Sequence, residues 1–315
     1  MSKIAFIYPG QGAQKAGMGA DFYENSEIAR YIFDQAGEEL DLDMKELCFE
    51  ENDRLDLTEY TQAAMVTTCL AMTRVAESKG LKADITAGLS LGEYPAIAAA
   101  RGMNDMDAIR LVRKRGILMQ NTVPAGEGAM CAVISMAAEE IEKVIEPIAD
   151  VSVANYNCPG QIVITGKTDA VEEAAAKLKE AGARRTIMLN VSGPFHSQML
   201  VPAGEKLAEE LEHTRFHELR IPYVTNVTAE KVTDIRETPG LLTTQISSPV
   251  RWMQSMERMI ADGVDTFVEI GPGKTLEGFL RKIDRSVKVF HISQWEDVDK
   301  VCTELADSGK MMEEA

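Results

Sequence analysis

The chain has few basic residues for its size. Its 315 residues include 33 lysines and arginines against 50 aspartates and glutamates, which gives a formal net charge of -17 at pH 7. Nucleic acids and anionic membrane surfaces are themselves negatively charged, so this balance argues against either as the main partner. An acidic protein partner would have to bind at a local basic patch.

Cysteine and long apolar runs are also scarce. The five cysteines form no C-x-x-C pair and show no ligand spacing with histidine, which predicts no disulfide and no metal site and fits a reducing compartment. The first ten residues, MSKIAFIYPG, contain only a short apolar run, so they do not form a signal peptide, and no stretch approaches the length of a membrane span. We therefore expect a cytoplasmic protein that makes no membrane contact.

The remaining composition is that of a globular protein, with 45% hydrophobic and 26% charged residues. Short apolar runs flanked by turn signals predict strands at 4–8, 84–87, 221–225, 266–270 and 287–292. Helical patterns separate them, the clearest at 58–79, and a surface helix is expected from 296 onward. This order predicts an α/β fold in which helices cover both faces of a mostly parallel sheet.

Between residues 126 and 192 the pattern changes to a compact alternation. Strands are predicted at 129–135, 151–155, 161–165 and 185–190, and helices at 137–148 and 170–181. This β-α-β-β-α-β order is typical of a ferredoxin-like arrangement. We therefore expect a large, discontinuous α/β-hydrolase-like domain, residues 1–125 and 193–315, with a small ferredoxin-like subdomain, residues 126–192, inserted into it.

A G-x-S-x-G pentapeptide, Gly88 to Gly92, lies between a predicted strand and a predicted helix at 93–101. Such a turn exposes a serine hydroxyl and aims the first N–H groups of the helix at a developing oxyanion. Ser90 is therefore a candidate nucleophile. The alternative is that Ser90 only caps the following helix.

A serine nucleophile needs a base, and the chain has only four histidines. His213 and His217 lie in a polar segment without a third metal ligand, and His291 lies in an apolar strand. His196 follows a Gly-Pro-Phe turn at the end of the inserted subdomain, where residues of a cleft are expected. We predict that His196 is the base.

Arg115 lies on the apolar face of a helix predicted at 105–122. A buried guanidinium needs a carboxylate, because an unpaired buried charge costs several kcal/mol. Either Glu93 forms a structural ion pair with Arg115, or Arg115 binds a substrate carboxylate through its two-pronged guanidinium.

The turn after the first strand, at residues 9–12, is rich in glycine. It could contribute a second backbone N–H group to an oxyanion hole, or it could cradle a phosphate. Its sequence matches neither nucleotide-binding glycine motif, which disfavours the phosphate interpretation.

These motifs occur together, and in this order, in one family. They are YPGQG (8–12), GLSLGEY (88–94), Arg115-Gly116 with Met119-Gln120, NYNCPGQ (155–161), GPFHS (193–197), Gln245 ahead of Pro249-Val250, and EIGPG (269–273). The chain resembles the malonyl-CoA–acyl carrier protein transacylases of type II fatty acid synthesis, which share a fold with polyketide synthase acyltransferase domains. The resemblance runs from about residue 4 to residue 293.

The resemblance implies an [acyl-carrier-protein] S-malonyltransferase that works by ping-pong transfer through a malonyl-Ser90 ester. His196 would accept the serine proton, and the backbone carbonyl of Gln245 would hold His196. The backbone N–H groups of Gln11 and Leu91 would bind the oxyanion. Malonyl-CoA, a coenzyme A thioester, would be the substrate of a monomeric enzyme with no metal and no tightly bound cofactor.

The resemblance also implies a selectivity. Arg115 would bind the malonyl carboxylate and so reject acetyl-CoA. Phe195 resembles the form of its motif that selects malonyl over methylmalonyl groups. Two positions depart from the family: Leu89 stands where many members have histidine, and Pro95 where a small polar residue is commoner. Neither takes part in this chemistry, so they bear on rate or packing.

The second substrate would be the holo acyl carrier protein, which is strongly acidic. Arg281, Lys282 and Arg285 resemble the basic end of the family and could form its docking site. The alternative is an ordinary solvated helix face.

Two other functions are weaker interpretations. A serine esterase or thioesterase would normally supply an acidic residue between serine and histidine, and it would have no use for Arg115 on a buried face. A non-catalytic carrier-binding module would have no need of Ser90, His196 and Arg115 together.

Overall fold

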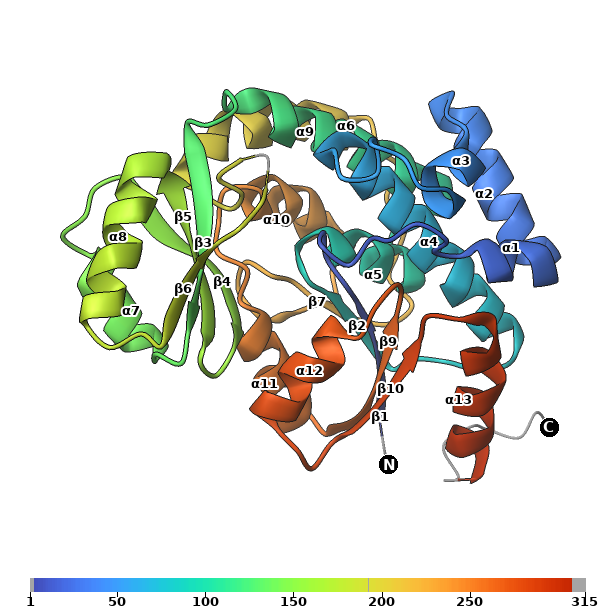
Figure 1. The fold of residues 1–315 in the computed structure, drawn as a ribbon. Coiled ribbons are helices and arrows are strands. Elements are labelled where there is room, and N and C mark those ends of the chain that lie inside the picture. Colours follow the sequence, from blue (N-terminus) through green and yellow to red (C-terminus); the bar gives the residue numbers. More distant parts are fainter. Residues whose placement is uncertain (1–2, 192, 308–315) are drawn as a thin grey trace.

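The computed structural model describes residues 3–191 and 193–307, which form two sheets with their covering helices (Figure 1). The six-stranded sheet has the order β10-β9-β1-β2-β7-β8, and all neighbours are parallel except β7 and β8. Its strands are β1 (Lys3–Tyr8), β2 (Ile85–Gly88), β7 (Tyr223–Val224), β8 (Lys231–Val232), β9 (Val264–Ile270) and β10 (Lys288–Ile292). The predicted mostly parallel sheet is confirmed.

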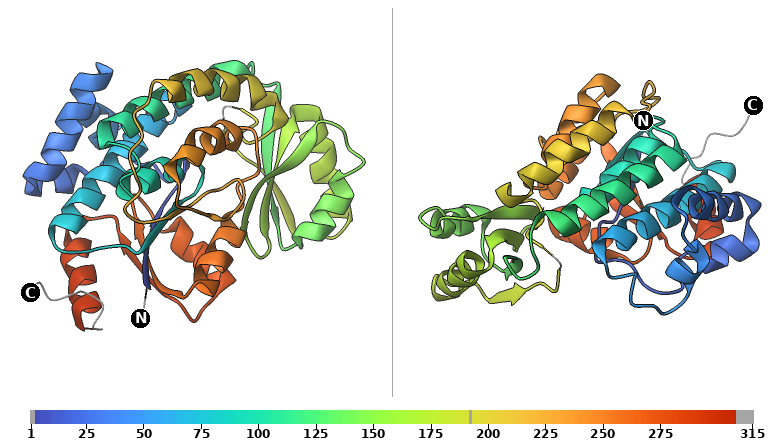
Figure 2. Two further views of the ribbon diagram at one scale, coloured as in Figure 1. Left: turned by 180° about the vertical axis from the view of Figure 1, so that it is seen from behind. Right: turned by 90° about the horizontal axis from the view of Figure 1, so that it is seen from above.

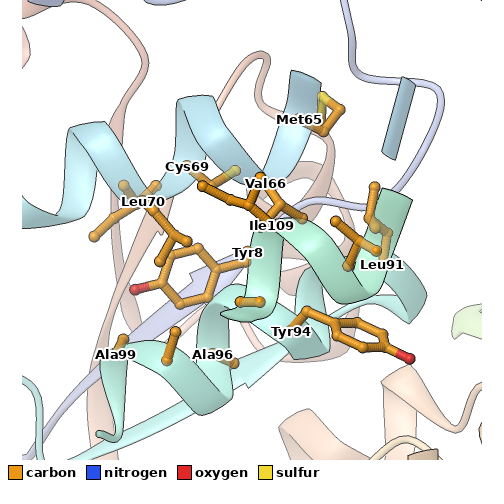
Figure 3. Close-up of a cluster of buried hydrophobic side chains, with 14 of the residues drawn as sticks. Tyr8, Met65, Val66, Cys69, Leu70, Leu91, Tyr94, Ala96, Ala99 and Ile109 are labelled. Carbon is orange, nitrogen blue, oxygen red and sulfur yellow. The ribbon is translucent and has the colours of Figure 1, made fainter. Parts of the chain in front are cut away.

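Helices pack on both faces of this sheet, as predicted. Side chains alternate along β1, so Phe6 and Tyr8 join one core cluster and Ala5 and Ile7 join another. The layer on one face contains α4, α5 and α6, and Tyr8 packs among its buried side chains (Figure 3). The opposite layer contains α11 and α12. The helices of this part are α1 (Ala20–Asn25), α2 (Glu27–Leu40), α3 (Met44–Phe49), α4 (Thr58–Ser78), α5 (Glu93–Ala99), α6 (Asp105–Thr122), α9 (Val201–Glu212), α10 (Thr238–Gln245), α11 (Trp252–Ala261), α12 (Thr275–Ile283) and α13 (Trp295–Asp307).

The four-stranded sheet lies to one side of the large one (Figures 1 and 2). It is antiparallel with the strand order β4-β5-β3-β6, which fits the ferredoxin-like arrangement predicted above from the order of elements along the chain. Its elements are β3 (Gly128–Ile134), α7 (Ala138–Ile145), β4 (Val151–Cys158), β5 (Gln161–Lys167), α8 (Thr168–Glu180) and β6 (Arg185–Met188). α7 and α8 cover one face, while Met130 and Val163 on the other face join the core of the large part.

Two features of this region differ from the prediction. β4 continues to Cys158 through register shifts, and backbone hydrogen bonds to Val250 join it to the segment before α11. β6 ends at Met188, two residues early, because Leu189 and Val191 turn into the wall of a cavity between the two sheets. The irregular segment after β6 is therefore part of a site.

The strand–turn–helix order around Ser90 is as predicted, with a short 3₁₀ turn, η1 (Ser90–Gly92), between β2 and α5. Pro95 lies buried in the first turn of α5, where a proline is tolerated. None of the helices in residues 3–191 and 193–307 is long and apolar enough to cross a membrane.

Candidate active site

The G-x-S-x-G turn brings three backbone segments too close together for side chains at its glycines. A Cβ atom on Gly88 would lie 1.8 Å from the carbonyl oxygen of Gly92, and one on Gly92 would lie 2.2 Å from that of Tyr8. Ser90 itself has a φ of 53°, in the left-handed region that residues other than glycine rarely adopt. The Ser90 hydroxyl lies 2.7 Å from His196 Nε2, and the N-cap of α5 is Gly92, so Ser90 does not cap that helix.

His196 meets Ser90 across the chain. Its Nε2 atom lies 2.7 Å from Ser90 Oγ. Its Nδ1 atom lies 2.9 Å from the carbonyl oxygen of Gln245 and 3.1 Å from that of Ser248. Because carbonyl oxygens only accept, Nδ1 must carry the proton, which leaves the Nε2 lone pair free to take a proton from serine. No carboxylate is needed to fix this tautomer.

His196 is also held neutral. Burial lowers its pKa to about 4 from an ordinary 6.5, and the positive charge of Arg115 acts in the same direction. The imidazole is therefore a proton acceptor throughout the neutral range.

This state of His196 can be tested by NMR. We expect the ring carbon shifts of His196 to keep their neutral values from pH 8 to pH 5.5 and to titrate with a midpoint of about 4, because desolvation disfavours the charged ring. The resonance is assigned by its loss in His196→Gln. A His196 midpoint near 6.5 would contradict the geometry described here.

Arg115 is buried and reaches the same point from α6. Its Nη2 atom donates to Gln245 Oε1 at 3.0 Å and to Ser90 Oγ at 3.3 Å, while Nη1 donates to Gln62 Oε1 at 2.9 Å. The predicted burial of Arg115 is confirmed. Neutral amide oxygens, rather than a carboxylate in direct contact, hold the guanidinium beside the Ser90 hydroxyl.

Glu93, the alternative partner of Arg115, approaches it only through Gln245. The Gln245 Nε2 atom donates to Glu93 Oε2 at 2.7 Å, while Gln245 Oε1 accepts from Arg115. Among residues 3–191 and 193–307 no ion pair within 4 Å joins Arg115 to Glu93. Burial raises the pKa of Glu93 to about 7, against hydrogen bonds from Gln245 and Asn226 that lower it.

Ser90, His196 and Arg115 line a cavity of about 740 Å³ between the two sheets. Gln11 and Leu91, the predicted oxyanion-hole residues, line the same cavity. So do Phe195, which is 7% exposed, and Leu89, one of the two family departures. Asn155 and Asn157, from the NYNCPGQ motif, also line the cavity, although the sequence indicates no role for either.

The predicted docking residues lie on and just after α12, whose first half lines this cavity. Lys282 is exposed, and its Nζ atom lies 3.5 Å from Oε1 of Gln161, a cavity residue. Arg281 is exposed and paired with Glu277 on its own helix, and Arg285 is exposed. The three basic residues therefore lie beside the cavity and do not line it.

Several residues that contact the site were not predicted from the sequence. Gln62, Ser248 and Asn226 contact Arg115, His196 and Ser90 respectively, and each contact spans more than 50 positions of the chain. No periodic or motif signal marks such a contact. In the described part of the chain, no cluster of three or more histidine, cysteine or acidic side chains could hold a metal ion.

Comparison with known proteins assigns the family. Residues 5–298 match the model of the acyl transferase domain. The malonyl CoA-acyl carrier protein transacylase of Bacillus subtilis (strain 168) is 44% identical over 95% of this chain and 96% of its own length. The chain belongs to the malonyl-CoA–acyl carrier protein transacylases. The predicted family and the predicted [acyl-carrier-protein] S-malonyltransferase activity in fatty acid synthesis are thereby confirmed.

Solved structures of such transacylases have the same fold. The Clostridium perfringens transacylase aligns with a TM-score of 0.94 at 42% identity, covering 98% of each chain. A malonyl-transacylase solved in complex with a type II polyketide acyl carrier protein aligns with a TM-score of 0.93 at 35% identity, covering 96% of this chain and 100% of that one. The substrates of this transacylase are accordingly malonyl-CoA and the acyl carrier protein.

Proposed function

We propose that this transacylase transfers the malonyl group in two steps through an ester on Ser90. The observation that carries the proposal is the 2.7 Å contact between Ser90 Oγ and His196 Nε2, with the Nδ1 proton of His196 fixed by two carbonyl oxygens. This is the arrangement of an activated nucleophile and its general base. The Nη2 atom of Arg115 lies 3.3 Å from the same hydroxyl. Arg115 can therefore bind the free carboxylate of a malonyl group whose thioester carbonyl lies at Ser90.

In the first step Ser90 Oγ attacks the thioester carbonyl carbon of malonyl-CoA while His196 Nε2 takes the hydroxyl proton. The backbone N–H groups of Gln11 and Leu91 stabilise the resulting oxyanion. The carbon–sulfur bond then breaks, and the proton on His196 passes to the departing sulfur of coenzyme A. The malonyl-Ser90 ester remains.

The second step reverses this sequence with a new thiol. The pantetheine thiol of the holo acyl carrier protein gives its proton to His196, and its sulfur attacks the ester carbonyl. The carbon–oxygen bond breaks, and His196 returns the proton to Ser90 Oγ. The products are malonyl–acyl carrier protein and free enzyme.

Arg115 selects the acyl group. Its guanidinium pairs with the malonyl carboxylate, and Gln62 and Gln245 hold it for that purpose. An acetyl group leaves the charge unpaired, so acetyl-CoA is rejected. Phe195, on the wall of the cavity, narrows the space for a methyl branch and favours malonyl over methylmalonyl groups.

Isotope exchange tests the two-step mechanism without the carrier protein. Incubation with malonyl-CoA and labelled free coenzyme A should move the label into malonyl-CoA, because the ester on Ser90 returns its malonyl group to any coenzyme A thiol. A serine hydrolase would instead consume malonyl-CoA with steady release of coenzyme A. Transfer that requires both substrates together, with no exchange, would rule out the ester.

The carrier protein docks on the basic residues Arg281, Lys282 and Arg285 in this proposal, beside the cavity that its pantetheine arm must enter. Changing all three to glutamate is expected to raise the KM for the carrier protein about tenfold, since each exposed pair contributes roughly 0.2–1 kcal/mol. Coenzyme A exchange should stay unchanged. The measurement is steady-state transfer at varied carrier protein and varied salt.

A matched control carries the same change of charge elsewhere. Lys143, Lys177 and Lys179 are exposed on α7 and α8, the helices on the outer face of the small sheet. Their change to glutamate should leave the KM for the carrier protein within about twofold. If both triple variants raised the KM for the carrier protein equally, net charge rather than this docking site would explain binding of the carrier protein.

The proposal also includes the remaining expectations from the sequence and from the family resemblance. The enzyme works as a cytoplasmic monomer with no metal and no tightly bound cofactor, and it binds neither nucleic acid nor membrane. The chain divides into a catalytic domain, residues 1–125 and 193–315, and a subdomain, residues 126–192, that closes the cavity; residue 192 lies outside the described residues.

A further inference from the structure

Two side chains hold the strained backbone of Ser90: Gln245 Nε2 donates to the Ser90 carbonyl oxygen at 3.0 Å, and Asn226 bonds the backbone on the other side of the residue. Asn226 follows β7, the strand paired with β2, and is 1% exposed. Its Oδ1 atom accepts from the Ser90 N–H group at 2.7 Å, and its Nδ2 atom donates to the Gly88 carbonyl oxygen at 2.7 Å. The carboxamide therefore spans the turn and satisfies a donor and an acceptor on either side of Leu89.

These two bonds fix the orientation of the carboxamide. A rotation that exchanged its oxygen and nitrogen would set an NH₂ group against the Ser90 N–H group and an oxygen against the Gly88 carbonyl. Both contacts would be repulsive in a buried site. Only the orientation with two hydrogen bonds fits the turn.

Asn226 is itself anchored to the rest of the site. Its backbone N–H group donates to Glu93 Oε2 at 3.1 Å, and that oxygen also accepts from Gln245 Nε2 at 2.7 Å. Glu93 is fully buried in the first turn of α5. A single carboxylate oxygen thus joins the residue that spans the turn to the residue whose carbonyl holds His196.

A left-handed backbone at a residue other than glycine costs of order 1–3 kcal/mol and persists only where its surroundings enforce it. At Ser90 this conformation sets where Oγ points relative to His196 Nε2, and where the next N–H group, that of Leu91, lies. Relaxation of the turn would misalign the nucleophile and the oxyanion donor together. The hydrogen bonds of Asn226 oppose that relaxation directly.

We propose that Asn226 is a positioning residue for acyl transfer, which holds the Ser90 turn in its reactive conformation through these two hydrogen bonds. Asn226 does not line the cavity. The inference rests on the proposed role of Ser90 as the nucleophile. It adds that attack by Ser90 requires a residue outside the G-x-S-x-G motif.

Two substitutions test it. Asn226→Asp keeps the shape but replaces the Nδ2 donor with an oxygen facing the Gly88 carbonyl, and Asn226→Ala removes both bonds without adding a charge. Each is expected to lower kcat about 100-fold, the scale of a misplaced reacting group. The KM for malonyl-CoA should stay within about twofold, because Arg115 and the cavity wall are untouched.

A second readout follows Ser90 without the substrate. Phenylmethylsulfonyl fluoride sulfonylates an activated serine and has neither a carboxylate for Arg115 nor a coenzyme A group. Its rate of reaction with Ser90, measured by intact mass, should fall in parallel with kcat in both variants. Circular dichroism and thermal unfolding establish that the assayed proteins are folded.

Asn52 supplies the matched control. Its carboxamide also binds backbone groups, accepting from the Leu55 N–H group at 2.9 Å and donating to the Leu47 carbonyl at 3.1 Å, but it lies in the loop after α3. Asn52→Asp is expected to lower the melting temperature and leave both kcat and the labelling rate unchanged.

The outcomes separate the inference from the proposed function. Parallel losses of kcat and labelling in folded Asn226 variants support it. Labelling of a folded variant at the wild-type rate, or an effect confined to KM, overturns it. Wild-type protein whose Ser90 is not labelled would instead overturn the proposed nucleophile, and the inference with it.

Discussion

Ser90→Ala is expected to abolish malonyl transfer, with a fall in kcat of at least about 10⁵-fold, because it removes the atom that accepts the acyl group. Loss of a serine nucleophile in a comparable catalytic unit costs roughly 10⁶-fold. Alanine is smaller than serine and still lies in the left-handed turn, so the fold should survive. The measurement is transfer to the carrier protein by mass, with thermal unfolding alongside.

A buried serine elsewhere is the control for this variant. Ser255 lies in α11 with its hydroxyl bonded to the Arg251 carbonyl, outside the cavity. Ser255→Ala should keep at least about half of the wild-type rate, since one neutral hydrogen bond contributes only about 1 kcal/mol to stability. Ser90→Ala protein that still transferred malonyl groups at an appreciable rate would exclude an ester on Ser90.

Arg115→Ala is expected to have the second largest effect, and to change selectivity as well as rate. Loss of one partner of a buried charge pair costs about 2–5 kcal/mol, so kcat/KM for malonyl-CoA should fall by roughly 30- to 5,000-fold. Acetyl-CoA has no carboxylate to lose, so its transfer should be maintained or rise. Competition between the two thioesters, followed by mass of the acyl-enzyme, measures the ratio directly.

Two further variants sharpen this test. Arg115→Lys keeps the charge but cannot form a two-pronged contact, so it should recover only a small part of the rate. Arg113 lies on the same helix, but it pairs with Glu59 and does not line the cavity. Arg113→Ala should therefore preserve the preference for malonyl-CoA. Equal losses for malonyl-CoA and acetyl-CoA in Arg115→Ala would assign Arg115 a structural role only.

Much of the fold could be predicted because its signals are local. The helix at 105–122 has the predicted bounds, and its apolar face placed Arg115 in the interior before any contact was known. The alternation along β1 and the strand order of the small sheet follow from the same periodicity and from connection rules. β8 was missed, because two residues carry no periodic pattern.

The site was predictable only in part. Ser90 was indicated by its turn and His196 by its place at a boundary between predicted domains, and the structure brings the two together. The contacts that hold them come from irregular segments: Ser248 contributes only a carbonyl, and Asn226 follows a two-residue strand. A backbone carbonyl is available at every residue, so no sequence pattern distinguishes the one that binds His196.

The measurement that tests the central claim most directly is the intact mass of the protein after brief incubation with malonyl-CoA. The account predicts one malonyl adduct on the wild-type protein, located at Ser90, absent from Ser90→Ala and removed by addition of holo acyl carrier protein. A wild-type protein that gains no mass while transfer proceeds, or an adduct that persists in Ser90→Ala, would contradict it.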